Sequence, residues 1–238
     1  MKYAPYSFSK INTFFECPQK FDYSYVNKIS KDKDYSDPSY FRRGRFIHAY
    51  IADRLKGGDG LLSGFADVDM EDKLSLTDSA ETTLENEYIS ISYDFNKNEI
   101  EKQIFLSHQM KPTNKARAAM LGYIDYFAVH DDFAMIVDWK SGKYRPDANY
   151  NQLELYAVWV LEKHPEVTEI DLIFYYVEHN KFSVRTVTSS EVESFKNKII
   201  ENIDIIENEE EFKPTPSKRS CLHCAFFDTC SEEHGIIL

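Results

Sequence analysis

Two runs of β-branched and aromatic residues constrain the fold of this chain most strongly. They cover residues 123–129 and 133–139, and the polar residues 130–132 separate them. This pattern predicts a β-hairpin. If the turn is centred between Asp131 and Asp132, the pairing of the two strands is fixed, because a slip of one residue would turn every side chain to the other face.

One face of this hairpin is predicted to carry three charged groups. Asp125 would lie opposite Asp138, with Cβ atoms roughly 5 Å apart. Lys140 shares the face of Asp138, whereas Trp139 points the other way toward packing. Paired carboxylates usually share a cation or a proton, and with the lysine they could hold a divalent metal and neutralise a phosphate. Taken alone, the same residues also fit a solvated hairpin face.

A helix is predicted after the hairpin, and it carries two more polar candidates. Apolar residues recur between residues 153 and 161, and Pro165 ends the pattern. Gln152 and Tyr156 are four residues apart and therefore share one face of this helix. Either side chain could hydrogen-bond a backbone phosphate or Lys140.

These segments, G-x-I-D, D-W-K-S-G and Q-x-x-x-Y, resemble the catalytic core of the PD-(D/E)XK nuclease superfamily in its RecB-like branch. That branch includes nuclease domains of recombination helicase-nucleases, CRISPR-associated adaptation nucleases and phage exonucleases. The resemblance implies catalytic roles for Asp125, Asp138, Lys140, Gln152 and Tyr156. It also implies one or two Mg²⁺ or Mn²⁺ ions held by the two aspartates, with the main-chain carbonyl of Trp139 as a further ligand.

Helical periodicity is also predicted over residues 41–55, where apolar residues including Phe41 are available for the core. Within it, Gly44 to His48 resembles the G-x-x-x-H motif of the same branch, in which the histidine is a metal ligand. A single helical histidine is more often a surface or packed residue. A neutral imidazole is nevertheless a common ligand where carboxylates supply the remaining positions.

Four cysteines have a spacing that suits a metal site: Cys17, Cys221, Cys224 and Cys230. Their thiolates could bind zinc or an iron-sulfur cluster, and reduced cysteines without metal are the plain alternative. Residues 7–21 resemble the N-terminal signature of RecB-like nucleases that carry a cluster. The resemblance implies a [4Fe–4S] cluster that joins the two chain ends, although His223 and His234 keep zinc as an alternative.

The charge distribution predicts local contacts with DNA. The net charge of −12 argues against a general nucleic-acid coat protein, because phosphate affinity comes from Lys and Arg. An acidic exterior more often reflects solubility. The basic candidates for DNA contact are Arg42, Arg43, Arg45, Lys115, Arg117, Lys143 and Arg145.

The expected fold is α/β, with a central mixed sheet flanked by helices and a cluster joining the chain ends. One domain is expected over residues 1–238, with a helical part at about 1–98, a nuclease core at about 99–190 and a C-terminal helix plus cysteine segment at about 190–238. Residues 27–40 are predicted to form a loop. Ser190 and Glu193 are predicted to form a capping box that opens the last long helix.

The resulting hypothesis is a metal-dependent DNA nuclease, an exonuclease that acts on single strands or DNA ends. One alternative is a CRISPR-adaptation nuclease that trims spacer precursors with an integrase; another is a non-catalytic iron-sulfur DNA-binding or scaffold subunit. A protein partner could be an integrase, a helicase or a recombinase, since the chain has no Walker motif of its own. The lack of long apolar runs and of a signal peptide predicts a cytoplasmic protein without membrane contact, and the oligomeric state stays open.

Overall fold

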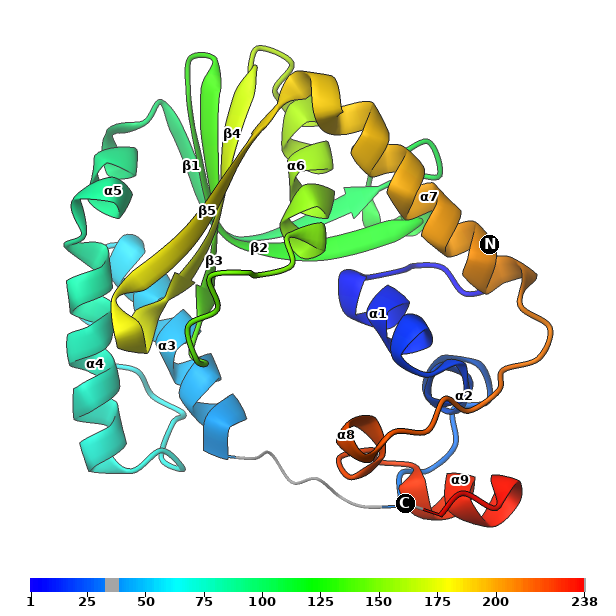
Figure 1. Ribbon diagram of the computed structural model, residues 1–238. Coiled ribbons are helices and arrows are strands. Elements are labelled where there is room, and N and C mark those ends of the chain that lie inside the picture. Colours follow the sequence, from blue (N-terminus) through cyan, green and yellow to red (C-terminus); the bar gives the residue numbers. More distant parts are fainter. Residues whose placement is uncertain (33–38, 238) are drawn as a thin grey trace.

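A five-stranded sheet organises the structure, which is a computed structural model that describes residues 1–32 and 39–237 (Figure 1). The strands are β1 (Lys97–Leu106), β2 (Met120–His130), β3 (Phe133–Lys140), β4 (Glu169–Tyr176) and β5 (Lys181–Thr188). They lie in sequence order, and all neighbours are antiparallel except β3 and β4. The parallel pair needs a crossover, which α6 (Asn151–Lys163) provides. The predicted α/β fold with a mixed sheet is confirmed.

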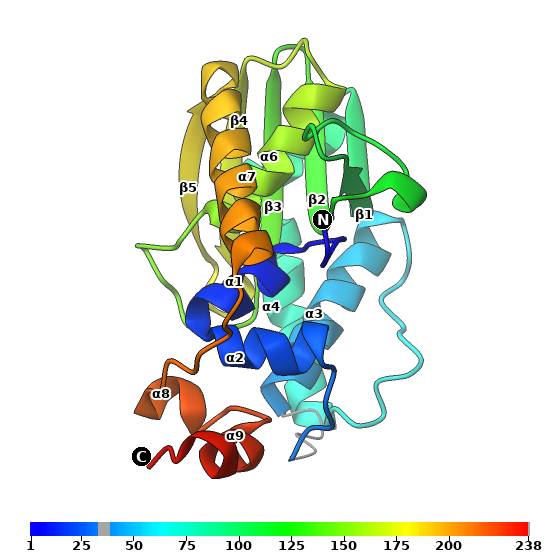
Figure 2. The same cartoon turned by 90° about the vertical axis from the view of Figure 1, so that its right-hand side faces the viewer.

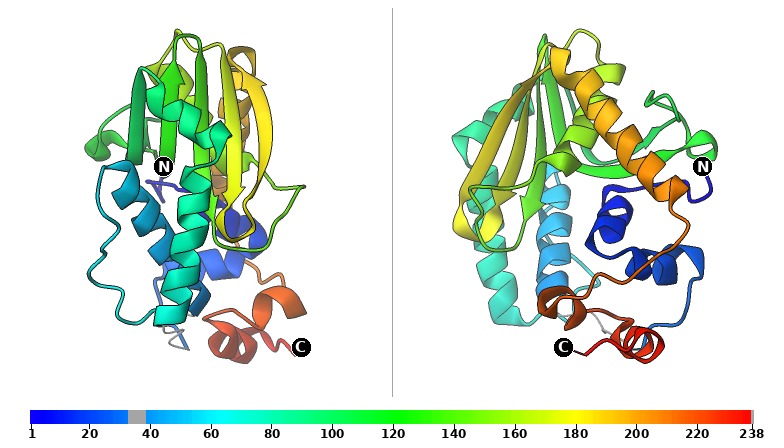
Figure 3. Two further views of the ribbon diagram at one scale, coloured as in Figure 1. Left: turned by 90° about the vertical axis from the view of Figure 1, so that its left-hand side faces the viewer. Right: turned by 45° about the vertical axis from the view of Figure 1, so that its right-hand side comes forward.

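Helices cover both faces of the sheet. On one face, α6 and α7 (Val192–Asn208) pack with α1 (Phe8–Glu16) and α2 (Pro18–Phe21) into the larger apolar core, as Figure 2 shows for α6 and α7. On the other face lie α3 (Ser39–Leu55), α4 (Met70–Leu84) and α5 (Glu87–Ser90), which Figure 3 shows from the opposite side. Two short helices, α8 (Lys218–Cys221) and α9 (Phe227–His234), follow α7.

The predicted hairpin register is confirmed where β2 and β3 pair. The ladder runs from His130 opposite Phe133 to Tyr126 opposite Val137. Asp131 in the turn has a left-handed φ of 51°, a conformation that aspartate tolerates better than most residues. The hydrophobic pattern and the turn therefore fixed the pairing, as the sequence predicts.

Two local predictions are wrong. Phe41 is exposed, because the first turn of α3 extends to the edge of a cavity instead of lying against the core. The capping box consists of Thr188 and Glu191, because a 3₁₀ turn begins there before α7. The predicted loop over residues 27–40 is confirmed for 27–32. Residues 39 and 40 instead belong to α3, and residues 33–38 lie outside the described residues.

The β1–β2 ribbon bends sharply at one position. The pairing skips Glu101 and Asp125, which would face each other, and Glu101 has a left-handed φ of 53°. On either side of this point the side chains of β2 change face: Ile124 packs in the core under α6, whereas Tyr126 packs under α3. In Figure 1, β2 accordingly turns from upright to nearly horizontal below α6.

Both ends of the chain are tied to the rest of the molecule. Tyr6 forms a parallel bridge with Met120, and its hydroxyl donates a 2.8 Å hydrogen bond to Glu207 on α7. Near the other end, the Thr215 hydroxyl donates to the carbonyl of Glu16 at 2.8 Å. Within the described ranges, no helix is both long enough and apolar enough to cross a bilayer.

Candidate active site

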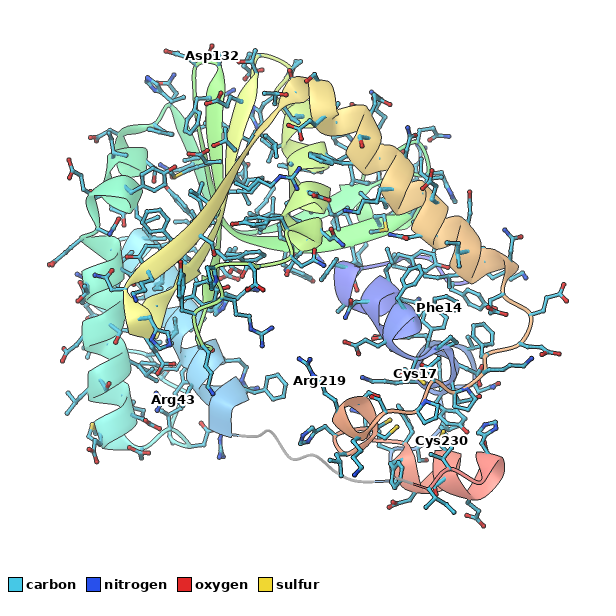
Figure 4. All side chains as sticks on the ribbon, in the orientation of Figure 1. Phe14, Cys17, Arg43, Asp132, Arg219 and Cys230 are labelled. Atoms are coloured by element: carbon cyan, nitrogen blue, oxygen red, sulfur yellow. The ribbon has the colours of Figure 1, made fainter. Side chains whose placement is uncertain are left out.

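A cavity of about 1030 Å³ opens between α1 and α3, and the sheet forms its floor. Its lining comes from α1, α3, β1, β2, β3 and α6, which Figure 4 shows around the centre of the molecule. Every residue expected to be catalytic or to bind the metal lines this cavity: His48, Asp125, Asp138, Trp139, Lys140, Gln152 and Tyr156. Residues from His48 to Tyr156, more than a hundred positions apart in the sequence, thus contribute to a single site.

Asp125 lies where β2 separates from β3. Its Oδ2 accepts a 2.9 Å hydrogen bond from the main-chain N–H of Trp139, which replaces the ladder bond that the bent strand no longer supplies. The expectation that Asp125 and Asp138 form a cross-strand pair is therefore wrong, although both line the cavity. The bend turns Asp125 toward the edge of β3 and leaves its Oδ1 3.4 Å from Nδ1 of His48.

A third candidate ligand, Glu101, joins His48 and Asp125. One ligand atom from each of the three lies within 4.8 Å of the others, and this is the one such group among the described residues. One imidazole nitrogen and carboxylate oxygens suit Mg²⁺ or Mn²⁺. The left-handed backbone of Glu101 costs about 1–3 kcal/mol, a strain that often marks functional positions.

Asp138 and Lys140 form an ion pair beside these ligands, with the carboxylate buried and the lysine partly exposed. Asp138 is 5% exposed, and its Oδ2 lies 2.6 Å from Nζ of Lys140. Burial, and then the charge of Asp125, raise the pKa of Asp138 to about 6, while Lys140 opposes this shift. Among the described residues, Oδ2 is the one buried side-chain polar atom with no regular hydrogen bond, so the ion pair with Lys140 is its main polar contact. A buried carboxylate oxygen with so few partners can also accept a cation.

Gln152 and Tyr156 contact each other on α6. Nε2 of Gln152 donates a 2.8 Å hydrogen bond to the Tyr156 hydroxyl. The Tyr156 ring packs directly over Gly122, where an added Cβ would lie 2.7 Å from Cε1 of the ring. The glycine of G-x-I-D therefore makes room for the tyrosine of Q-x-x-x-Y, two motifs that the sequence separates by 30 residues.

A comparison with known protein families gives a match over nearly the whole chain. The model of the PD-(D/E)XK nuclease superfamily matches residues 5–231. The chain belongs to the PD-(D/E)XK nuclease superfamily. No curated protein sequence matches it.

One solved structure shows the fold of this PD-(D/E)XK chain at low sequence identity. A proposed exonuclease from Eubacterium rectale is 12% identical, with a TM-score of 0.53 over 98% of this chain and 88% of that chain. SSO0001 is 13% identical, with a TM-score of 0.37 over 79% of this chain and 80% of that chain, which is too distant to carry an argument. At these identities the first likeness concerns the fold alone.

The basic residues predicted to contact DNA are dispersed over this PD-(D/E)XK domain. Arg45 lines the cavity. Arg43 forms ion pairs with Asp72 on α4 and with Glu178, so its charge is already matched. The others do not line the cavity: Arg42, Lys115, Arg117, Lys143 and Arg145. Lys56, at the end of α3, does line it, although sequence reasoning missed this residue.

The four cysteines line a second, small cavity of about 30 Å³ between the start of α2 and the C-terminal segment. Figure 4 labels Cys17 and Cys230 on the two sides of this region. Burial, and then the neighbouring thiols, raise the pKa of Cys230 to about 11. No three of the sulfurs lie within 4.8 Å of one another.

The protonation of His48 predicts how metal binding depends on pH. Burial opposes the charged imidazole, but the hydrogen bond and charge of Asp125 outweigh it and raise the pKa to about 9. A metal ion must displace this proton, so we expect the affinity for Mn²⁺ to rise up to about tenfold per pH unit from pH 7 and to level off above pH 9. Calorimetry in buffers of different ionisation enthalpy measures the affinity and the released proton; an affinity that is constant from pH 7 to 9 would contradict it.

The raised pKa of His48 also makes the stability of the metal-free protein depend on pH. Because the folded pKa of His48 lies above its unfolded value, the protonated pair with Asp125 stabilises the fold fully below pH 6.5. This contribution is lost as the pH rises through about 9. Metal binding and the proton on His48 therefore favour the fold in opposite pH ranges.

Proposed function

We propose that this protein is a divalent-metal-dependent deoxyribonuclease of the RecB-like branch, an exonuclease that hydrolyses phosphodiester bonds in single strands or at DNA ends. The observation that carries the proposal is the convergence of two groups in one cavity. His48, Glu101 and Asp125 form a compact set of nitrogen and oxygen ligands, and the buried Asp138–Lys140 pair lies beside them.

The residues have separable roles in this proposal. His48, Glu101 and Asp125 would hold Mg²⁺ or Mn²⁺, with Asp138 and the carbonyl of Trp139 as further ligands. When bound, the cation supplies Lewis acidity and acidifies a water molecule. Lys140 places an ammonium group where negative charge grows on the scissile phosphate, and Asp138 holds that ammonium in position.

Gln152 and Tyr156 would position the DNA strand. Their mutual hydrogen bond fixes both side chains at the cavity wall, and Gly122 holds the tyrosine ring against β2. A group that is held in place before the substrate arrives loses less entropy when the substrate binds. These two side chains therefore contribute orientation, whereas Lys140 contributes charge.

Digestion of end-labelled DNA tests the activity. Single-stranded and double-stranded substrates are incubated with Mn²⁺, Mg²⁺ or EDTA, and the products are separated by length. We expect metal-dependent release of short products, which Asp138→Asn abolishes. Asp132→Asn, at the exposed turn far from the cavity, should digest DNA at the wild-type rate (Figure 4). Digestion in EDTA, or an active Asp138→Asn protein, would refute the proposal.

We also propose that Cys17, Cys221, Cys224 and Cys230 hold a [4Fe–4S] cluster with a structural role. Their arrangement around one buried cavity supports a shared ligand. The iron and zinc content and the visible absorbance of anaerobically purified protein decide between an iron-sulfur cluster and a zinc site. Stoichiometric zinc without iron would contradict the cluster.

A further inference from the structure

The cavity carries two exposed aromatic side chains that the proposed chemistry does not use. Phe41 on α3 is 54% exposed, Tyr123 on β2 is 53% exposed, and both line the cavity. Large apolar groups exposed at a functional cavity mark a surface that contacts a ligand. Both residues are therefore candidates for substrate contact.

Each of these rings lies on the same element as a proposed metal ligand. Phe41 precedes His48 by seven residues on α3, which is two helical turns and about 10 Å along the axis. Tyr123 precedes Asp125 by two residues on β2, which is about 7 Å along the strand. The rings thus flank the metal ligands from two different elements, at distances that a short stretch of nucleotide chain can span.

The ring of Tyr123 is also held in a fixed orientation. Nε2 of Gln103 donates a hydrogen bond to its hydroxyl, and Gln103 is the residue opposite Tyr123 in the β1–β2 ladder. The bond joins two neighbouring strands beyond the bend at Glu101. A ring that is oriented before the ligand binds loses little conformational entropy on binding.

The charges of the cavity's own side chains nearly cancel before a metal binds. Its lining contains three basic residues, Arg45, Lys56 and Lys140, and the histidine His48, against four acidic residues, Asp53, Glu101, Asp125 and Asp138. The chain as a whole has a net charge of −12. Because electrostatic affinity for nucleic acid comes from basic side chains, a DNA ligand needs an uncharged contact as well. Base stacking on aromatic rings supplies such a contact and tolerates any sequence.

We propose that Phe41 and Tyr123 form a stacking subsite that binds unpaired nucleobases beside the metal ligands. Inside a duplex both faces of each base are covered by its neighbours, so these rings can stack on unpaired bases or on the outer face of a terminal base, but not on internal base pairs. The subsite rests on the proposed function for its DNA ligand, and it directs single-stranded DNA into the cavity.

Equilibrium binding tests the subsite without requiring cleavage. Fluorescence anisotropy is measured in Ca²⁺ with labelled single strands of about twelve nucleotides, either complete or with abasic sites, and with a duplex of the same sequence. We expect Phe41→Leu and Tyr123→Leu each to weaken binding of the complete single strand by about 5- to 100-fold. Tyr123→Phe keeps the ring and should stay within about twofold of the wild type.

Two controls make the outcome specific. Phe15 on α1 is 49% exposed but does not line the cavity, so Phe15→Leu should bind as the wild type does. The abasic strand should bind wild-type protein and the Phe41→Leu and Tyr123→Leu variants about equally. If both leucine variants keep the wild-type preference for complete over abasic strands, the subsite is wrong. Ring-dependent binding together with digestion of DNA in the absence of metal would support the subsite and contradict the proposed metal-dependent nuclease.

Discussion

Replacement of Lys140 by methionine is expected to slow DNA digestion by about 100- to 1000-fold at saturating metal. Methionine keeps the length of the side chain and its apolar contact with Phe174, over whose ring the ammonium lies at 4.8 Å. The substitution removes the one group of the buried pair that can neutralise charge on the phosphate. A steady-state assay should show the loss in kcat, since Lys140 acts as charge develops.

The substitution has a second effect that can be separated by pH. The charge of Lys140 lowers the pKa of Asp138, whereas burial and Asp125 raise it. Without the lysine, Asp138 should be protonated over a wider pH range near neutrality, so the Mn²⁺ affinity of the variant should fall more steeply between pH 8.5 and pH 6.5 than that of the wild type. Metal binding should recover at the higher pH while digestion should not. Full recovery of digestion would mean that Lys140 only keeps Asp138 ionised. Lys163→Met, on the exposed end of α6, is the matched control.

Replacement of Cys230 by serine is expected to release the C-terminal segment from the rest of the protein. Among the described residues, the buried core there consists of Tyr23, Phe226 and Cys230, with four partly buried apolar residues packed against it. Besides this core, the segment is held by a few hydrogen bonds, such as those from Thr229 to Asp32. So small an apolar contact cannot offset the entropy of ordering the segment, which leaves the proposed cluster as the main attachment.

Limited proteolysis should detect the release. In the Cys230→Ser protein we expect cleavage near Pro214 at least about tenfold faster than in the wild type, with the remaining fragment intact by mass spectrometry. Leu222→Ser changes an exposed side chain between two of the cysteines and serves as the control. Equal cleavage rates for all three proteins would show that the cysteines do not hold this segment in place.

Much of the site follows from local patterns in the sequence. The alternation of residues around the Asp131 turn predicts the register of β2 and β3, and the spacing of Gln152 and Tyr156 on one helix predicts that they share a face. Such predictions succeed because hairpin pairing and helix periodicity depend on neighbouring residues. The family resemblance adds His48, which no local pattern connects to the hairpin.

The remaining features depend on long-range geometry. Glu101 has no motif of its own, and only its position opposite Asp125 in the β1–β2 register identifies it as a candidate ligand. The bend that separates Asp125 from a direct pairing with Asp138 arises from a left-handed residue that is not glycine, which sequence patterns do not indicate. Phe41 looks like a core residue because periodicity shows its face of the helix but not where the sheet ends.

The bend in the β1–β2 ribbon links the cation to the shape of the whole cavity. Beyond the bend, Met120 pairs with Tyr6 in a β-bridge, and Tyr6 lies just before α1. His48 belongs to α3 on the opposite wall of the cavity. A metal held by Glu101, Asp125 and His48 would therefore brace this joint and set the width of the opening. Metal binding would then have two effects. It would supply the cation for the proposed hydrolysis, and it would fix the width of the opening through which a DNA strand must pass.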